Sequence, residues 1–527
     1  MVNADGPRDA ARERAGLDRR RFLGAAGAVG VAAATAACDT SGNGPTGASR
    51  TTTASPSAEA AEAAERDLAG NADWRLRSTG PPDAVEGYPD RVSVLPGEGF
   101  GLHVSTTAPG FTVSAYRIGW YDGAGARLVW RSPRTAGHRQ PPGRLDDATR
   151  TVRADWARTM DVATEGWPPG AYLLRLDAEN GHQRYVPLVV RSPSAAGRTV
   201  VMHAVATWQA YNTWGGHDLY RGEDGAYSSR SLAVTFDRPY ALDGAEKFLV
   251  YERALVVLAE RLGIPLAYTT GADVHADPAA LRGATAVLSP GHDEYWTPQQ
   301  RQHVTAARDA GANLAFLGAN TCYRRVRLED AAPGNPRTVV CYKTAYQDDP
   351  YFASHPDLPT NDFRQPPAAD PESPLTGVLY EGYPTDAPYV VHAPDHWLFA
   401  GTGVRAGDRF DHLVGVEYDR VTPGAPTPRP LEIIGHSPLV CNGRHSHADS
   451  AYYTAASGAG VFATGTMRWV EGLMAGTREN GRNHGMDART GAFVTRTTEN
   501  LLRAFAEGPA ATARPQPRDN VAAVYAT

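Results

Sequence analysis

The pattern of apolar residues changes its period once along this 527-residue chain, at a short linker of small and polar residues, 192–197. From about residue 73 to residue 193, short runs alternate between apolar and polar side chains, as at 101–105 and 112–120, and turns containing glycine or proline separate them. Such alternation over short runs predicts half-buried β-strands. We therefore expect residues 73–193 to form an immunoglobulin-like β-sandwich.

Beyond the linker, residues 198–509 combine strand-like and helical patterns. Apolar strand-like runs occur at 198–202, 264–269, 284–288 and 313–317, and helical spacing occurs at 246–262 and 298–310. Strands and helices that alternate at this spacing are typical of a parallel α/β sheet. The predicted fold class is α/β plus all-β, in which a glutamine-amidotransferase-like α/β domain follows the sandwich and precedes a C-terminal tail at 510–527. The proline-rich stretch 323–457 shows no clear period.

The first 38 residues have the pattern of an export signal. Arg19, Arg20 and Arg21 precede Phe22 and an apolar, alanine-rich run that ends at residue 37. This run is too short for a membrane span, and consecutive arginines before Phe-Leu resemble the twin-arginine motif. We expect residues 1–38 to be a signal peptide read by the twin-arginine translocase, and the protein to be exported to the cell surface or the extracellular space.

The end of this signal raises the question of a lipid anchor. Thr35-Ala36-Ala37-Cys38 resembles a lipobox, although threonine stands where leucine is usual. The sequence predicts either lipidation of Cys38, which would be the protein's membrane contact, or cleavage nearby that discards this cysteine. Residues 39–72 are rich in small and polar residues and are expected to form a disordered tether.

Charge and cysteine content exclude several classes of function. The formal net charge is -6, and no basic stripe carries interleaved aromatic residues, so no nucleic-acid partner is expected. Cys38, Cys322, Cys341 and Cys441 form no Cys-x-x-Cys pair, which argues against a thiolate zinc site. Cys322 and Cys341 are either a disulfide across a hairpin or two buried free thiols. None of the four lies at a strand-to-helix elbow, where a cysteine nucleophile would be expected.

Polar clusters follow three of the predicted strands. They are Trp208-Gln209-Ala210-Tyr211-Asn212, Gly291-His292-Asp293-Glu294-Tyr295-Trp296 and Gly318-Ala319-Asn320. Because the carboxyl ends of parallel strands share one edge of the sheet, these clusters are expected to line one crevice. His292 is a candidate general base beside two carboxylates. In the alternative interpretation, Asp293 or Glu294 caps the next helix and His292 is a hydrogen-bonded structural residue.

These three clusters together resemble the C-terminal region of the N,N-dimethylformamidase large (β) subunit, over about residues 73–509. That family holds a mononuclear iron with two tyrosines and one glutamate. The resemblance implies that Tyr211 and Glu294 are metal ligands and that Tyr172, on the strand after Pro169-Gly170, is the second phenolate. It also implies that His292 and Asn320 are catalytic residues that do not bind the metal.

The resemblance implies an exported, iron-dependent hydrolase that cleaves the C–N bond of a small amide. Two phenolates and a carboxylate are hard anionic ligands that favour Fe(III). The metal would polarise the carbonyl or a water, with His292 as general base and Asn320 as a donor to the oxyanion. The large subunit has an additional N-terminal region, a cytoplasmic location and a small partner subunit, whereas this chain has an export signal and a tether. The sequence therefore leaves open what the substrate is and whether a small partner subunit is needed. The sequence leaves open whether the chain forms a homo-oligomer.

The competing hypothesis is a cell-surface lipoprotein that binds carbohydrate or peptide without catalysis. Trp120, Trp130 and Trp214 offer aromatic faces of the kind on which sugars stack. Metal-free protein that binds glycans would favour this hypothesis over the hydrolase.

Overall fold

The computed structural model describes residues 65–332, 335–475 and 484–526. They belong to one compact unit, Glu62–Thr527. The predicted signal peptide, Cys38 and tether residues 39–64 lie outside the described residues. The folded unit begins earlier than the predicted boundary at residue 72, because the Glu65 carboxylate accepts hydrogen bonds from Arg127 and Tyr121. Among the described residues, no helix combines the length and apolar character that crossing a membrane requires.

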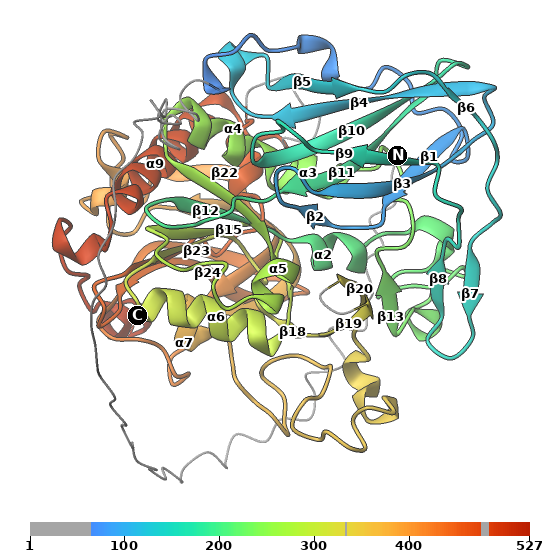
Figure 1. The fold of residues 1–527 in the computed structure, drawn as a ribbon. Coiled ribbons are helices and arrows are strands. Elements are labelled where there is room, and N and C mark those ends of the chain that lie inside the picture. Colours follow the sequence, from blue (N-terminus) through green and yellow to red (C-terminus); the bar gives the residue numbers. More distant parts are fainter. Residues whose placement is uncertain (1–64, 333–334, 476–483, 527) are drawn as a thin grey trace, which may run out of the picture. The chain divides into compact units, whose positions relative to one another are not determined.

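The N-terminal part of this unit contains two larger β-sheets (Figure 1). One sheet has the order β1-β3-β9, with β1 (Val85–Pro89), β3 (Gly99–Thr106) and β9 (Met160–Ala163). The other has the order β2-β11-β10-β4-β5, with β2 (Ser93–Val94), β11 (Gln183–Val190), β10 (Gly170–Ala178), β4 (Gly110–Ile118) and β5 (Ala126–Arg131). Leu102 and Val104 of β3 pack with Leu174 and Leu176 of β10 in one apolar core. Alternate residues of each strand therefore fill the space between the sheets.

A seven-stranded sheet forms the centre of the second part. Its order is β14 (Leu266–Thr270), β12 (Thr199–His203), β15 (Ala286–Gly291), β17 (Asn313–Gly318), β25 (Gly460–Ala463), β24 (Arg444–Thr454) and β23 (Leu431–Cys441). The five strands from β14 to β25 are parallel, and β24 and β23 continue the sheet antiparallel. The predicted combination of an α/β part with a β part is thus confirmed.

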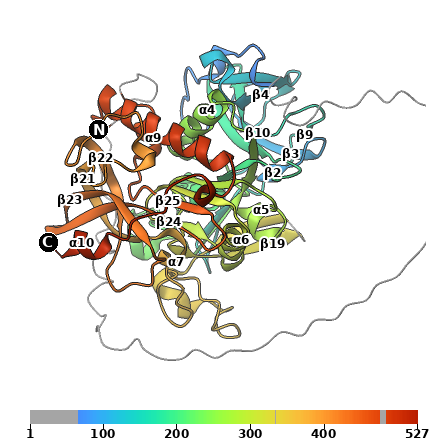
Figure 2. The same ribbon diagram turned by 90° about the vertical axis from the view of Figure 1, so that its left-hand side faces the viewer.

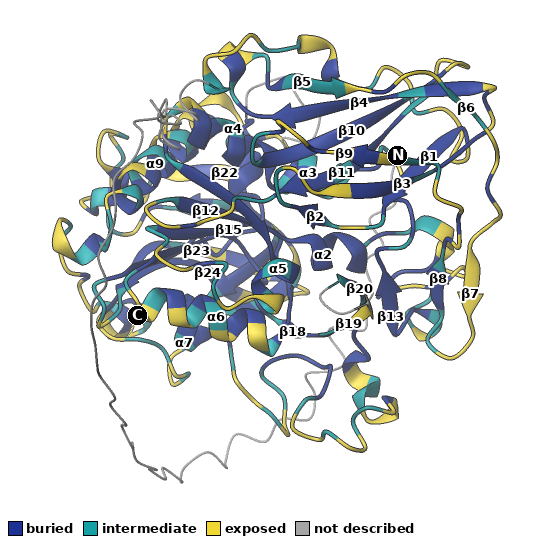
Figure 3. Ribbon diagram, in the orientation of Figure 1, coloured by how far each residue is buried: buried dark blue, intermediate teal, exposed yellow. Residues whose placement is uncertain are grey.

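Helices cover both faces of this sheet (Figure 2). Residues of β12 alternate between the two cores, since Val201 packs with α4 (Arg253–Arg261) and α9 (Ala488–Ala506), whereas Met202 packs with α5 (Gly271–Ala276) and α6 (Pro298–Asp309). Figure 3 shows the strands buried between these layers. A strand buried on both faces must be apolar throughout, which is the pattern seen at 284–288.

Two predicted elements differ from those observed. The helix predicted at 246–262 is interrupted at Glu252 and forms α3 (Glu246–Tyr251) and α4. The predicted tail contains a short helix, α10 (Val521–Tyr525), whose Val521 and Val524 are buried in the core beside β23. The stretch 323–457 contains several strands, including β19 (Arg327–Ala332), β20 (Asn335–Val340) and an antiparallel ribbon of β21 (Leu379–Val390) and β22 (Arg409–Arg420).

A buried ion pair joins the two parts. The Arg117 guanidinium of β4 lies 2.7 Å from the Glu260 carboxylate of α4, and both side chains are less than one-tenth exposed. Glu260 also accepts hydrogen bonds from the Trp120 amide at 3.0 Å and the Tyr268 hydroxyl at 2.8 Å. Because the donors come from β4, the following turn and β14, this carboxylate fixes the β-sheets against the edge of the central sheet.

Replacing Arg117 by methionine leaves the buried Glu260 charge without its cation. We expect Arg117→Met to lower the free energy of unfolding by about 3–5 kcal/mol, since breaking one side of a buried pair exposes the full desolvation cost of the other. Chemical denaturation of the full chain measures this. Arg134→Met removes an exposed pair with Glu179 and serves as the control, with little expected change. Equal stability of the two variants would contradict the prediction.

Candidate functional site

The three polar clusters predicted from the sequence do follow neighbouring strands of the sheet. Helix α2 (Val205–Ala210) begins after β12, residues 292–294 follow β15, and residues 319–320 follow β17. Gly291 and Gly318 are partners in the β15–β17 ladder. A Cβ atom on Gly318 would lie 1.5 Å from the Gly291 carbonyl oxygen, so the two strand ends can approach only because residue 318 is glycine.

The centre of the site is the Glu294 carboxylate, which contacts two tyrosine hydroxyls. The Tyr211 hydroxyl lies 2.6 Å from Oε2 of Glu294. The Tyr220 hydroxyl lies 2.7 Å from Oε1 and 3.0 Å from Oε2. The two hydroxyls are 2.9 Å apart, and the side chain of Glu294 is only 1% exposed. Four oxygen atoms from three side chains thus meet at one buried point.

Backbone contacts hold Glu294 in this position. The Thr207 hydroxyl of α2 accepts hydrogen bonds from the amides of Glu294 at 3.1 Å and Tyr295 at 3.2 Å. The amide of Arg324 donates to the Glu294 carbonyl at 2.9 Å. Helix α2 therefore carries both Thr207, which fixes the backbone of Glu294, and Tyr211 at its C-cap, which contacts the carboxylate.

His292 lies between two carboxylates. Its Nε2 atom is 3.5 Å from Oε2 of Glu294 and 3.6 Å from Oε2 of Glu417, which comes from β22. Among the described residues, neither ring nitrogen of His292 has a hydrogen-bond partner, and the same holds for Oε2 of Glu417 and Oδ1 of Asn320. The backbone of Asn320 is held by its amide, which donates to Asp419 at 2.8 Å. Buried polar atoms normally have partners, so this group is arranged for a ligand, an ion or water.

The surroundings of Glu294 and Glu417 shift the pKa values of these two carboxyls in opposite directions. Burial alone would raise the pKa of Glu294, but His292 and the cations Arg324 and Lys343 lower it to about 2. Burial, and then the charge of Glu294, hold the pKa of Glu417 well above its usual range. The pKa values of the two carboxyls are thus shifted in opposite directions, and Glu294 is the more acidic of the pair.

Cations also flank the two phenols. The Nζ atom of Lys343, a fully buried residue, lies 3.3 Å from the ring centroid of Tyr220, and Nζ of Lys247 lies 4.8 Å from that of Tyr211. Burial raises the pKa of both phenols well above the ordinary value. In the structure both therefore act as neutral hydroxyl groups beside the Glu294 carboxylate.

The predicted ligand Tyr172 does not reach this site. Its hydroxyl donates to the Pro168 carbonyl at 2.7 Å, and its ring stacks on Trp167 within the core between the two β-sheets. The predicted convergence of Tyr172 with Tyr211 and Glu294 is therefore not observed. Tyr220, which the sequence did not single out, is the second tyrosine at Glu294.

The helix-capping interpretation of the acidic pair is also wrong. Thr297 is the N-cap of α6 and accepts a hydrogen bond from the Gln300 amide. Asp293 accepts a hydrogen bond from the Ser289 hydroxyl at 2.9 Å, and burial raises the pKa of this carboxyl to about 7. Neither Asp293 nor Glu294 caps the helix, so the position of Glu294 is not explained by the needs of α6.

The sequence leaves open whether Cys322 and Cys341 form a disulfide, and the structure shows that they are two buried free thiols. No group of three or more His, Cys, Asp or Glu side chains within the described ranges can hold a metal ion. The phenol oxygens of Tyr211 and Tyr220 are the side-chain oxygens nearest to the Glu294 carboxylate that could complete a metal site there.

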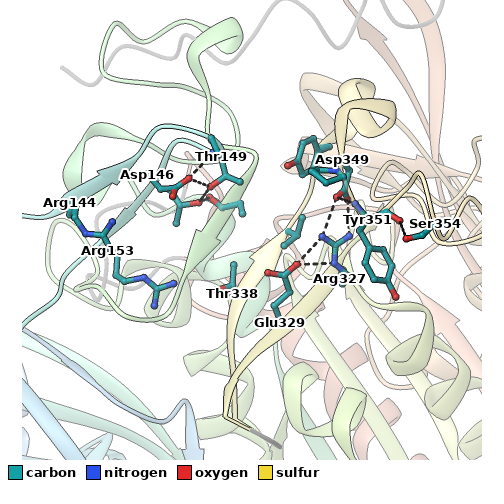
Figure 4. Close-up of a pocket in the computed structure, with 16 residues that line it drawn as sticks. Arg144, Asp146, Thr149, Arg153, Arg327, Glu329, Thr338, Asp349, Tyr351 and Ser354 are labelled. Carbon is teal, nitrogen blue, oxygen red and sulfur yellow. Dashed lines mark hydrogen bonds and ion pairs between the residues drawn. The ribbon is translucent and has the colours of Figure 1, made fainter.

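A wide cleft lies elsewhere, between the hairpin of β7 (Arg144–Asp146) and β8 (Thr151–Arg153) and the strands β19 and β20 (Figure 4). It has a volume of about 750 Å³. Arg327 on its wall is already bonded to Glu329 at 2.9 Å and Asp349 at 2.7 Å. The charged groups of this cleft are thus engaged with each other, unlike the unsatisfied atoms around His292.

Replacing Thr207 by valine removes the acceptor of the two amides next to the carboxylate. We expect Thr207→Val to lower the free energy of unfolding by about 1–3 kcal/mol, because two buried N–H groups lose their partner. Thr207→Ser keeps the hydroxyl and should stay close to the parent protein. Equilibrium denaturation compares the three proteins, and equal losses in both variants would show that the hydroxyl is not what matters.

Comparisons with known proteins complete the description of this site. Curated proteins give no match. Among solved structures, one match is a crystal structure of a Paenibacillus sp. cycloisomaltooligosaccharide glucanotransferase complexed with cycloisomaltoheptaose, at 10% identity and a TM-score of 0.15, covering 52% of this chain and 36% of that chain. At that score it carries no argument. The family model "N,N-dimethylformamidase beta subunit-like, C-terminal" matches residues 112–484, more than half of the chain, and that range includes every residue of the Glu294 site.

Proposed function

We propose that this chain, which belongs to the N,N-dimethylformamidase beta subunit-like family, is a metal-dependent hydrolase that cleaves the C–N bond of a small amide. The family supports the reaction class. The observation that carries the proposal for this chain is the contact of two tyrosine hydroxyls with one buried carboxylate, at distances of 2.6–3.0 Å.

Tyr211, Tyr220 and Glu294 are the proposed metal ligands. Two phenolates and a carboxylate supply three hard, anionic oxygens, which suit a mononuclear Fe(III) ion better than zinc or copper. The ring nitrogens of His292 and Oε2 of Glu417 have no partner among the described residues and lie beside the same carboxylate, so the residues present fit such an ion. When bound, the ion would supply Lewis acidity toward an amide carbonyl or a water molecule.

The remaining residues of the site have roles in moving and holding protons. His292 accepts a proton from the attacking water at Nε2 and later returns it to the nitrogen of the leaving amine. Glu417 lies 3.6 Å from the same Nε2 atom, and its carboxyl oxygen accepts a hydrogen bond from the imidazolium between these two events. Asn320 donates a hydrogen bond to the oxyanion of the tetrahedral intermediate. Its backbone is fixed by Asp419, which keeps this donor in place.

The proposal also covers the fold type of the two parts and the location of the protein. The paired β-sheets are proposed to be immunoglobulin-like and the central sheet to be glutamine-amidotransferase-like. The arginine motif at 19–21 supports export through the twin-arginine translocase, with Cys38 as the proposed site of a lipid anchor at the cell surface. The proposed partners are the small amide substrate and the translocase.

Iron content and colour test the ligand set. We expect purified protein to bind stoichiometric iron and to show a visible phenolate-to-iron charge-transfer band. Tyr211→Phe, Tyr220→Phe and Glu294→Ala each remove one ligand oxygen, and each should weaken iron binding by at least about 10-fold. Metal analysis and absorption spectra of the purified variants measure both effects.

Tyr172→Phe is the matched control for this experiment. Its hydroxyl is bonded within the β core, so this variant should keep its iron and its visible band. If Tyr172→Phe loses the band while Tyr220→Phe keeps it, then Tyr172 is the second phenolate ligand, as the family resemblance implies, and Tyr220 is not. Protein without iron that binds glycans would instead favour the carbohydrate-binding alternative.

Substitution of His292 and Glu417 tests the proton-transfer roles. We expect His292→Asn to lower kcat for hydrolysis of a small formamide about 100- to 10,000-fold, which is the usual contribution of a positioned acid–base group. Glu417→Gln should lower kcat less, because the base remains and only its partner is lost. Iron content should be unchanged in both variants. A fall in iron content that matches the fall in rate would instead assign both residues to metal binding.

A further inference from the structure

Helix α2 carries the residues that assemble the site, yet it has only six residues, Val205–Ala210. Thr207 holds the amide of Glu294, and Tyr211 at the C-cap reaches its carboxylate. A helix this short gains little stability from its own hydrogen bonds, so its position depends on tertiary contacts. The groups that hold its two ends therefore determine where the Tyr211 hydroxyl lies.

A buried carboxylate holds the N-terminal end. Glu252, at the break between α3 and α4, is 0% exposed. Its Oε1 atom accepts hydrogen bonds from the amide of Ala204, the N-cap of α2, at 3.2 Å and from the Trp208 indole at 2.7 Å. Its Oε2 atom is 2.5 Å from Nδ1 of His203, the last residue of β12. One carboxylate thus ties the end of β12 to the first turn of α2.

A buried guanidinium holds the C-terminal end. Arg238 is 0% exposed, and each of its five N–H groups has an acceptor in the segment 209–217. Nε donates to the side-chain oxygen of Gln209 at 3.2 Å, and Nη2 donates to the carbonyls of Gln209 at 3.3 Å and Asn212 at 3.0 Å. Nη1 donates to the carbonyls of Trp214 at 3.2 Å and His217 at 3.0 Å.

The residues on either side of Tyr211 are thus both bonded to Arg238. Gln209 precedes Tyr211 by two positions, and Asn212 follows it directly. The side chains of these two residues are also bonded to each other at 3.1 Å. The Arg238 guanidinium therefore holds the chain both before and after Tyr211. These bonds set the direction in which the Tyr211 ring leaves the helix.

We infer that Glu252 and Arg238 are positioning residues that hold the two ends of α2 so that the Tyr211 hydroxyl meets the Glu294 carboxylate. For the metal-binding role of Tyr211, this inference rests on the proposed function. The signs of the two charges suit the helix, because a carboxylate at the N-terminal end and a cation at the C-terminal end both complement its dipole. Neither residue contacts the reacting centre, so each acts through α2.

Stability alone is a poor explanation for Arg238. Its hydrogen bonds go to four carbonyls and one amide oxygen and not to a carboxylate. Burying a charged group in this way is costly, and an apolar side chain of similar size often serves the stability of a core as well or better. Burial lowers the pKa of this guanidinium to about 10, which still leaves it charged at neutral pH. Lysine has three donors and no planar fork, so it cannot reproduce the five bonds.

The experiment reads the position of Tyr211 directly. The full chain is labelled with 3-fluorotyrosine, prepared without metal and measured by ¹⁹F NMR, and the Tyr211 and Tyr220 resonances are identified by their loss in Tyr211→Phe and Tyr220→Phe. We expect the Tyr211 resonance to shift or broaden in Arg238→Met and in Glu252→Gln. A Tyr211 resonance that is unchanged in folded Arg238→Met would overturn the inference.

Arg337→Met is the matched control. Arg337 is another arginine that is only 2% exposed, and it bonds the Pro89 and Phe236 carbonyls and the Asp237 carboxylate, none of which belongs to α2. This variant should lose stability but keep the Tyr211 resonance in place. Displacement of Tyr211 in both variants to the same extent would show a general loss of packing and would also overturn the inference. If Arg238→Met does not fold, Arg238→Lys keeps the charge with fewer donors, and its Tyr211 resonance decides in the same way.

Iron binding supplies a second readout. We expect iron affinity to fall about 10- to 100-fold in Arg238→Met relative to Arg337→Met, as when a group that orients a ligand is removed. Parent protein that binds no iron would contradict the proposed function but would leave the ¹⁹F result intact as the test of positioning. Iron affinity equal to that of Arg337→Met, with Tyr211 displaced, would separate Tyr211 from the metal and overturn its role as a positioned ligand.

Discussion

The Glu294 carboxylate is the group on which the arrangement of this protein most depends. A carboxylate removed from water is costly unless donors surround it. Here the donors are two phenols, and they arrive on the segment that follows β12, whereas the carboxylate follows β15. The contact can form only if β12 and β15 are neighbours and if α2 lies across their carboxyl ends. The parallel sheet, the close approach of Gly291 and Gly318, and the clamped helix α2 are the conditions for this one contact.

Much of this could be predicted from the sequence, because parallel strands leave strong local signals. The apolar run at 284–288, the N-cap Thr297 and the clusters containing Tyr211, Glu294 and Asn320 each indicate their own position, and the rule that ligands bind at carboxyl ends of strands brings the clusters together. The family resemblance is confirmed by the match over residues 112–484. These signals do not tell which side chains meet in the loops that follow the strands.

The failures have physical reasons of the same kind. Tyr172, Leu174 and Leu176 stand at every second position of β10, so their side chains lie on the same face of the strand. That face fills the core between the two β-sheets, where all three are found. Leu173, which points the other way, packs against residues of α2. Tyr220 was missed because it lies in an irregular segment, where the spacing of residues does not predict which way a side chain points. Glu417 lies on a ribbon whose strands have repeated register shifts, so that neither its face nor its neighbours follow from the sequence.

The protons of this site constrain which cation it can accept. Burial raises the pKa of both phenols, and burial together with the charge of Glu294 raises the pKa of Glu417. Binding of a cation at the phenol oxygens requires the loss of two protons from groups whose pKa values are already raised. A strongly acidic cation can compensate this cost, whereas a weakly acidic one such as Mg²⁺ cannot. The charge of Arg324 reduces the cost, because it acts to lower the pKa of Tyr220. The proposed preference for Fe(III) thus follows from the burial of the phenols as much as from the identity of the ligands.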